Sequence, residues 1–321
     1  MANIKLDKTK LGWWKSAVFY QIYPKSFCDS NGDGMGDLKG IISKLDYLEK
    51  LGIDGIWMSP VCASPQVDNG YDISDYCAID PMFGDMADME LLITEAKKRG
   101  ISIDLVLNHS SEQHFWFREA LKSKDNPYHD YYVWRDGDGI TPPNEMRATF
   151  GGSAWTWVPH LKQYYFHQFA VEQPDLNWEN PNLRKDLYKS IRFWVDKGVE
   201  GFRLDVIDQI AKEPDLEITG NGPKLFDFLE EMSREVLTEE GIVTVGEAAE
   251  MLQKAFVHRT GVESQTLRDL MASPDYSSRN ATRGWIMNIP GLADTELVKG
   301  DQYESYEQWM KLHNKDGAEH L

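Results

Sequence analysis

The sequence predicts an α/β protein in which parallel strands are joined by helical crossovers. Short runs of β-forming residues alternate with amphipathic helical stretches between residues 17 and 247. Apolar residues make up 41% of the 321 residues and charged residues 27%, which is enough apolar material for a sizeable core. Because such crossovers are right-handed, the alternation fits either a closed barrel or an open doubly wound sheet.

The first part of the chain contains three strand signals and two helix signals. Apolar runs at residues 17–24, 53–58 and 101–107 predict buried strands. Between them, residues 38–48 and 89–98 carry apolar side chains at helical spacing.

The alternation stops after the third strand and then resumes. Residues 109–172 are rich in aromatic residues, Pro and Gly, and so long a structureless loop would be unusual. A small inserted subdomain is therefore expected there. Beyond it, residues 183–194 and 225–237 predict helices, and residues 200–207 and 241–247 predict a fourth and a fifth strand.

Charge and cysteine content exclude several classes of partner and compartment. The chain has 34 basic and 52 acidic residues, a formal net charge of −18, which disfavours nucleic acid or an anionic membrane as partner. Three cysteines (Cys28, Cys62 and Cys77) cannot form a disulfide framework, and no apolar run has the length of a signal peptide core or a membrane span. We expect a cytoplasmic protein.

Two carboxylic residues stand where predicted strands end. Asp205 follows the fourth strand, Glu247 follows the fifth, and Arg203 shares one side of its strand with Asp205. Glycoside cleavage needs two carboxyl groups facing one bond, and a nearby guanidinium would keep a nucleophilic carboxylate ionised. A structural ion pair at the strand end is the alternative. The excess of aromatic residues, including 11 Trp, fits core packing or sugar stacking.

Two further groups of polar residues are candidates for function. His109 follows the third strand, at the mouth of a possible barrel, although a single His is more often structural. Residues 29–37 place oxygen-bearing side chains among glycines, at a spacing like the start of a calcium loop, but the closing Glu is missing. An acidic turn that caps the next helix is the alternative. No phosphate-binding, dinucleotide-binding or zinc motif is found in the sequence.

Taken together, these segments resemble the α-amylase family of glycoside hydrolases (family 13), within it the oligo-1,6-glucosidase and dextran-glucosidase group. The resemblance runs from residue 17 to about residue 248 and rests on nine segments in family order. They are AVFYQIYPKSFCDSNGDGMGDLKGI, GIDGIWMSP, NGYDISDY, DLVLNHSS, FGGSAW, QPDLNWENP, GFRLDVI, NGPKLFDFLEEM and VGEA.

The resemblance implies a (β/α)₈ barrel of TIM type with a subdomain inserted after the third strand. About five strand–helix units are recognisable. The expected division is residues 1–108 for the first part of the barrel, 109–172 for the insert over the active site, 173–248 for the second part and 249–321 for a divergent tail.

The resemblance also assigns roles to single residues. Asp205 would be the nucleophile, Glu247 the acid and base, and Arg203 the residue that orients Asp205. Val206 would mark a preference for α-1,6 over α-1,4 linkages. Substrate contacts would come from Asp68, Tyr71 and His109 at the terminal glucose and from Phe150, Phe169 and Gln173 near the cleft, and a structural Ca²⁺ from Asp29, Asn31, Asp33, Asp37 and the carbonyl of Met35.

After Glu247 the sequence departs from the family pattern. Members continue through three more strands to a second His-Asp pair and then a β domain, whereas His258, His313 and His320 here do not precede Asp. The expected function is hydrolysis of short α-1,6-linked glucosides with retention, by a monomer without organic cofactor. Alternatives are a non-catalytic or inactive truncated member and, within the class, an α-1,4-glucosidase, a phosphodisaccharide hydrolase or a sucrose isomerase.

Overall fold

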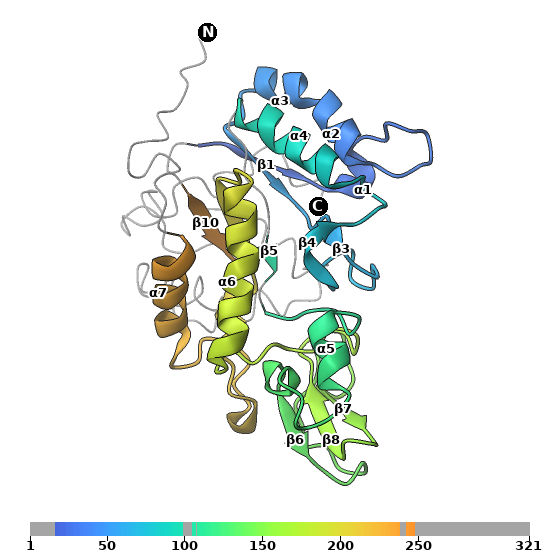
Figure 1. Ribbon diagram of the computed structural model, residues 1–321, viewed down its shortest axis with the longest axis vertical. Helices are drawn as coiled ribbons and strands as arrows, with labels where there is room; N and C mark the ends of the chain where they lie inside the picture. The colour runs from blue at the N-terminus through green and yellow to red at the C-terminus, as the bar shows by residue number, and fades with distance from the viewer. Residues whose placement is uncertain (1–16, 99–104, 107, 238–241, 248–321) are drawn as a thin grey trace, which may run out of the picture. The chain divides into compact units, whose positions relative to one another are not determined.

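The computed structural model describes residues 17–98, 105–106, 108–237 and 242–247 (Figure 1). Contacts divide the chain into two units after Glu247, and every described residue lies in the first. The expected tail (residues 249–321), with the three histidines that follow Glu247, lies outside the described residues, as do residues 101–104 and 107 of the third predicted strand.

The five predicted strands are present and pair in parallel within two sheets. In the first sheet β1 (Phe19–Ile22) pairs with β2 (Gly55–Met58), and Phe19 lies opposite Gly55. In the second sheet β9 (Gly201–Asp205) lies between β10 (Val243–Gly246) and β5 (Leu105–Val106). All five residues of β9 are buried, including the charged Arg203 and Asp205.

The predicted helices are also found, with one difference. The region predicted as one helix over residues 38–48 forms two, which meet at Lys44, and Gly52 ends the second with φ of 86°. That left-handed conformation is open to glycine without a Cβ clash, so the helix stops there. The helices of the parallel region are α2 (Leu38–Ser43), α3 (Leu45–Leu51), α4 (Met86–Lys97), α6 (Pro181–Asp196) and α7 (Leu225–Val236).

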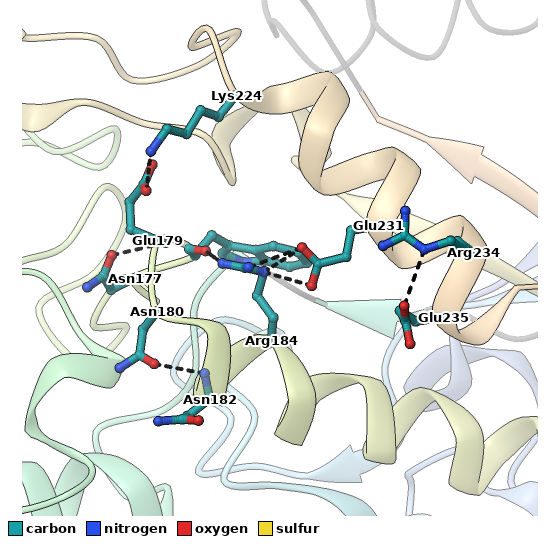
Figure 2. Close-up of polar contacts among 10 residues, drawn as sticks. Asn177, Glu179, Asn180, Asn182, Arg184, Lys224, Glu231, Arg234 and Glu235 are labelled. Carbon is teal, nitrogen blue, oxygen red and sulfur yellow. Dashed lines mark hydrogen bonds and ion pairs between the residues drawn. The ribbon is translucent and has the colours of Figure 1, made fainter.

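Helices α6 and α7 lie side by side and are joined by a half-buried ion pair (Figure 2). Nε of Arg184 on α6 donates to both oxygens of Glu231 on α7 at 3.1 Å, and Nη1 donates to the Trp178 carbonyl at 2.6 Å. The same guanidinium lies 5.1 Å from the ring centre of Phe228. This contact fixes the helix that follows β9 against the helix that precedes it.

Between β5 and α6 the chain builds an antiparallel sheet with its own core. The strand order is β6-β8-β7, formed by Trp134–Asp136, Gln163–Phe166 and Trp155–Val158, and α5 (Phe115–Ala120) lies beside the sheet in Figure 1. Part of the aromatic excess therefore packs here. The core comprises Val133, Met146, Ala154, Trp155, Tyr164 and Phe166.

Some short elements have no clear signal in the sequence. A hairpin of β3 (Cys62–Ala63) and β4 (Asp75–Ile79) flanks the polar segment that contains Tyr71. The remaining elements are α1 (Pro24–Phe27) and the 3₁₀ turns η2 (His129–Tyr131), η3 (Ile207–Gln209) and η4 (Pro214–Leu216). Among the described residues, no helix combines the length and apolar character needed to cross a membrane.

Candidate active site

The parallel pairing of β9 and β10 brings the two predicted carboxylic residues together. Leu204 lies opposite Gly246 in the register, so Asp205 and Glu247 leave the same end of the sheet. The Glu247 N–H donates to the Leu204 carbonyl at 2.9 Å, and the Ile207 N–H donates to the Glu247 carbonyl at 3.1 Å. These backbone bonds hold the two carboxyl groups at one edge, where barrel enzymes place their chemistry.

Arg203 pairs with both carboxylates at once. Its Nη1 contacts Oδ1 of Asp205, and its Nη2 lies 2.7 Å from Oε2 of Glu247. The three side chains are nearly buried, with exposed fractions of 9% for Arg203, 10% for Asp205 and 17% for Glu247. Buried charges are tolerated when they are paired, and here one guanidinium serves two acids.

The carboxyl groups of Asp205 and Glu247, the carboxylate pair from here on, are coupled. Burial raises the pKa of Asp205, Arg203 opposes that rise, and the neighbouring Glu247, which is hydrogen-bonded to Asp205, adds to it. The net effect raises the pKa of Asp205 to about 7, so near neutral pH this carboxyl group is present in both its protonated and its ionised form. A pair of this kind is suited to combined nucleophilic and acid–base chemistry.

The residue after Asp205 adopts a strained conformation. Val206 has φ of 37° and ψ of 43°, in the left-handed region that β-branched residues avoid. Its side chain is buried, and its N–H lies 3.4 Å from Oε2 of Glu247. The turn ends β9 abruptly behind Asp205, and strain of this kind is concentrated at functional sites.

A second group of predicted residues forms what we name the His109 cluster: Asp68, His109 and Gln173. Nε2 of Gln173 donates to Oδ2 of Asp68 at 3.0 Å and lies 3.0 Å from Nε2 of His109. The Phe169 ring lies 5.1 Å from the His109 ring, and the Phe150 ring lies 5.8 Å from Phe169. The cluster joins the β3–β4 segment, the end of β5 and the segment before α6.

Burial sets the charge states of the His109 cluster. It lowers the pKa of His109 to about 4, with nearby Asp175 opposing, so the imidazole is neutral at pH 7. Burial raises the pKa of Asp68, and the hydrogen bond from Gln173 opposes that rise. A carboxylate, an amide and a neutral imidazole can together bind several sugar hydroxyl groups as donors and acceptors.

Tyr71 lies between the two groups. Its ring centre is 5.9 Å from the guanidinium carbon of Arg203, and its backbone is hydrogen-bonded to His109. The segment around Tyr71 is shaped by Asp72, which accepts hydrogen bonds from the Val67 N–H at 3.0 Å and the Asp68 N–H at 2.9 Å. Tyr71 therefore connects the predicted catalytic residues with the predicted sugar-binding residues, because it contacts both Arg203 and His109.

A buried ion pair that the sequence analysis missed supports the His109 cluster. Nζ of Lys212 lies 2.6 Å from Oδ2 of Asp175 and donates to Oδ1 of Asn108 at 2.7 Å. The Lys212 and Asp175 side chains are 4% and 0% exposed. The Asp175 position, two residues after Gln173, was a possible signal. No spacing in the sequence connects Lys212 with either partner.

The residues expected to bind calcium form an acidic turn. Asp29 accepts hydrogen bonds from the amides of Asn31, Gly32 and Gly34 at 2.7–3.0 Å, and Asp33 accepts one from Met35 at 2.8 Å. Asp37 accepts from the Gly40 N–H at 2.6 Å and so caps α2. Within the part of the chain that the structure describes, no group of three or more His, Cys, Asp or Glu is arranged to hold a metal ion.

Comparisons with known proteins find matches to the α-amylase family. The family model "Alpha amylase, catalytic domain" matches residues 21–311. The match extends past residue 248, where the resemblance described in the sequence analysis ends. A trehalose-6-phosphate hydrolase of Escherichia coli (strain K12) is 55% identical, over 73% of this chain and 44% of that protein. An oligo-1,6-glucosidase of Parageobacillus thermoglucosidasius is 54% identical, over 73% of this chain and 45% of that one.

Solved structures of similar enzymes also match this chain. A trehalose-6-phosphate hydrolase of Bacillus licheniformis superimposes with a TM-score of 0.73 at 47% identity, over 78% of this chain and 48% of that chain. The present chain thus spans less than half the length of the relatives it matches.

Proposed function

The chain belongs to the α-amylase family, and from that premise we propose that it is a retaining α-glucosidase acting on short α-1,6-linked, isomaltose-type glucosides. Members of the family have a (β/α)₈ barrel as catalytic domain, and the parallel strands β1, β2, β5, β9 and β10 fit that class. The observation that carries the proposal is the position of Arg203 between Asp205 and Glu247 at adjacent strand ends.

The proposed reaction needs one carboxylate and one carboxylic acid. An Asp205 carboxylate oxygen attacks the anomeric carbon while Glu247 gives its proton to the leaving glycosidic oxygen. Water then attacks the covalent glucosyl-enzyme as Glu247 takes back a proton, which releases glucose with retained configuration. Retaining enzymes keep these groups about 5–5.5 Å apart. Contact with the same guanidinium brings Asp205 and Glu247 close together, and Arg203 stabilises the ionised form of Asp205.

The His109 cluster supplies the proposed pocket for the terminal glucose. Asp68, His109 and Gln173 are within hydrogen-bond distance of one another through the Gln173 amide, so a glucose can exchange those bonds for bonds to its hydroxyl groups. Phe169 and Phe150 provide apolar faces beside this pocket. Val206, beside the nucleophile, is proposed to favour the α-1,6 linkage.

A second function within the class is hydrolysis of a phosphorylated disaccharide. It is favoured by the 55% identity to the trehalose-6-phosphate hydrolase of E. coli. Both reactions would use the same carboxylate pair, so they differ only in which leaving sugar is accepted. A structural Ca²⁺ in the turn of residues 29–37 and a cytoplasmic monomer complete the proposal.

The experiment measures release of p-nitrophenol from its α-glucoside by the purified chain. Isomaltose, maltose and trehalose 6-phosphate serve as competing substrates. A 5-fluoro-glucosyl fluoride is added to trap the intermediate, and peptide mass spectrometry should place the adduct on Asp205. Asp205→Asn should abolish turnover and trapping, whereas Asp215→Asn, which removes an exposed carboxylate that pairs with Arg135, should retain both.

Three outcomes separate the hypotheses. Turnover with isomaltose as the strongest competitor supports the α-1,6 assignment, and competition by trehalose 6-phosphate alone supports the second function. Ligand binding without turnover or adduct supports a non-catalytic member. An adduct on any other residue contradicts the roles given to Asp205 and Glu247.

A further inference from the structure

Trp57 lies beside Arg203, although the sequence analysis assigned this residue no role. It is the third residue of β2, where it is half-buried, and its neighbours Ile56 and Met58 are fully buried. Because side chains alternate along a strand, Trp57 points to the opposite side of β2 from Ile56 and Met58. On that side, the guanidinium carbon of Arg203 lies 5.1 Å from the Trp57 ring centre.

This contact spans the two parallel sheets. Trp57 belongs to the β1–β2 sheet and pairs in register with Gln21, whereas Arg203 belongs to the β10-β9-β5 sheet. A cation over an indole ring within about 6 Å is attracted electrostatically, most strongly when both groups are shielded from water. Arg203 is 9% exposed and Trp57 is half-buried, so water is largely excluded from the cation and partly excluded from the ring.

The ring supplies a restraint that the two carboxylates do not. The contacts to Asp205 and Glu247 hold the Nη atoms at the edge of the guanidinium. A flat cation held only at its edge can still rotate out of plane about its bonds, whereas an aromatic face restricts that rotation. Trp57 and the Tyr71 ring, at 5.1 Å and 5.9 Å from the guanidinium carbon, both lie within this range.

We propose that Trp57 is a positioning residue that holds the Arg203 guanidinium in place between Asp205 and Glu247. The inference rests on the proposed function, because it assigns Trp57 a part in that reaction through Arg203. Without the ring, the guanidinium would stabilise the ionised Asp205 less well, and a smaller fraction of molecules would hold the nucleophile ready at neutral pH. Among the described residues, the charged and titratable groups that contact Arg203 include Asp205, Glu247 and Tyr71.

The test compares Trp57→Leu and Trp57→Phe with a matched control, Trp157→Leu. Trp157 is also half-buried, but it packs at a tilt against Tyr164 in the insert, with ring centres 4.8 Å apart. kcat and KM for the p-nitrophenyl glucoside are measured from about pH 4 to about pH 9. In parallel, the unfolding temperature of each variant is recorded over the same range.

Trp57→Leu should lower kcat about tenfold, which corresponds to an activation barrier about 1.4 kcal/mol higher. The acidic limb of the pH profile of kcat should move up by about half to one pH unit, and KM should stay within about twofold of the wild type. Trp57→Phe keeps an aromatic face and should stay near the wild type, and Trp157→Leu should leave the limb unmoved. A Trp57→Leu protein with the wild-type limb, or an equal shift in Trp157→Leu, overturns the proposal. Should the Leu variant not fold, Trp57→Met replaces it with the same expected shift.

The unfolding measurements keep this inference separate from the proposed function. If the wild-type chain shows neither turnover nor an adduct, that result refutes the proposed enzymatic function but not the positioning role of Trp57. Trp57→Leu should still raise the pH at which stability declines through ionisation of Asp205. An unchanged pH dependence of unfolding in that variant refutes the positioning role.

Discussion

Substitution of Lys212 by Met should be among the most damaging single changes in the described part of the chain. The change removes a buried ammonium that lies 2.6 Å from Asp175 and 2.7 Å from Asn108, and it leaves the fully buried Asp175 carboxylate without that cation. Breaking a buried pair at one partner costs about 3–5 kcal/mol, which corresponds to about 6–20 °C of unfolding temperature at about 2–4 °C per kcal/mol.

The control for this substitution is Lys189→Met. Its ammonium pairs with Asp186 at 2.7 Å, nearly the same distance, but the Lys189 side chain is 78% exposed. Water screens such a pair, so its loss should change stability little. Unfolding is followed by calorimetry and by urea denaturation with circular dichroism, to compare the midpoints and the slopes.

A double-mutant cycle decides whether burial is the cause. Adding Asp175→Asn to Lys212→Met removes the stranded charge, so the double variant should be more stable than the sum of the two single losses implies. Equal losses at Lys212 and Lys189, or strict additivity in the cycle, would show that the buried network contributes nothing beyond a surface pair.

Three other predictions follow from charge states and from the acidic turn. Because the pKa of Asp205 is raised, the folded chain between about pH 4 and about pH 7 binds a proton that the unfolded chain has lost. The stability that this residue contributes therefore falls as the pH rises through that range. Asp205→Asn should be more thermally stable than the wild type at about pH 8 but not at about pH 4. The pKa of His109 is lowered to about 4, so its contribution is lost as pH falls from about 6.5 towards 4, and His109→Gln should flatten the acid side of the stability profile while exposed His160→Gln does not. If the turn of residues 29–37 binds Ca²⁺, chelation should lower the unfolding temperature of the wild type and leave Asp33→Ala unchanged, and equal responses of the two proteins would contradict the calcium site.

The parallel strands and the proximity of Asp205 to Glu247 could be predicted from the sequence, because each strand end has a local signature. Residues 200–207 contain a short run of β-forming residues that ends at Asp205, although the charged Arg203 interrupts its apolar character. Glu247 ends another such run, so alignment of two strand ends was enough to bring the acids together. The break at Lys44 between α2 and α3 was not predicted, because the apolar spacing continues across it.

Other features depend on contacts between distant segments and have no local signature. Val206 is β-branched, so its residue type argues against the left-handed turn that the fold imposes there. From its residue type, Lys212 would be expected at the surface. Its burial follows from contacts with Asn108 after β5 and with Asp175 before α6, which are distant in the sequence. Trp57 looks like one more core residue of β2, and only the position of Arg203 across the sheets shows otherwise.

The way the insert is attached affects how the sheet of β5, β9 and β10 can assemble. β5 and β9 are neighbours in space, with Val106 opposite Asp205, although the whole insert separates them along the chain. Backbone bonds join its base: Leu176 N–H to the Asn108 carbonyl at 3.0 Å, and Glu112 N–H to the Glu172 carbonyl at 2.7 Å. Once these bonds close, the connection between the two strands is effectively shortened to the segment containing α6, and the entropic cost of strand pairing falls with it. The insert's own sheet joins segments close in sequence, and local contacts of that kind form fast. A large insertion beside β9 therefore adds little to the entropic cost of pairing β5 with β9, because backbone bonds close its base.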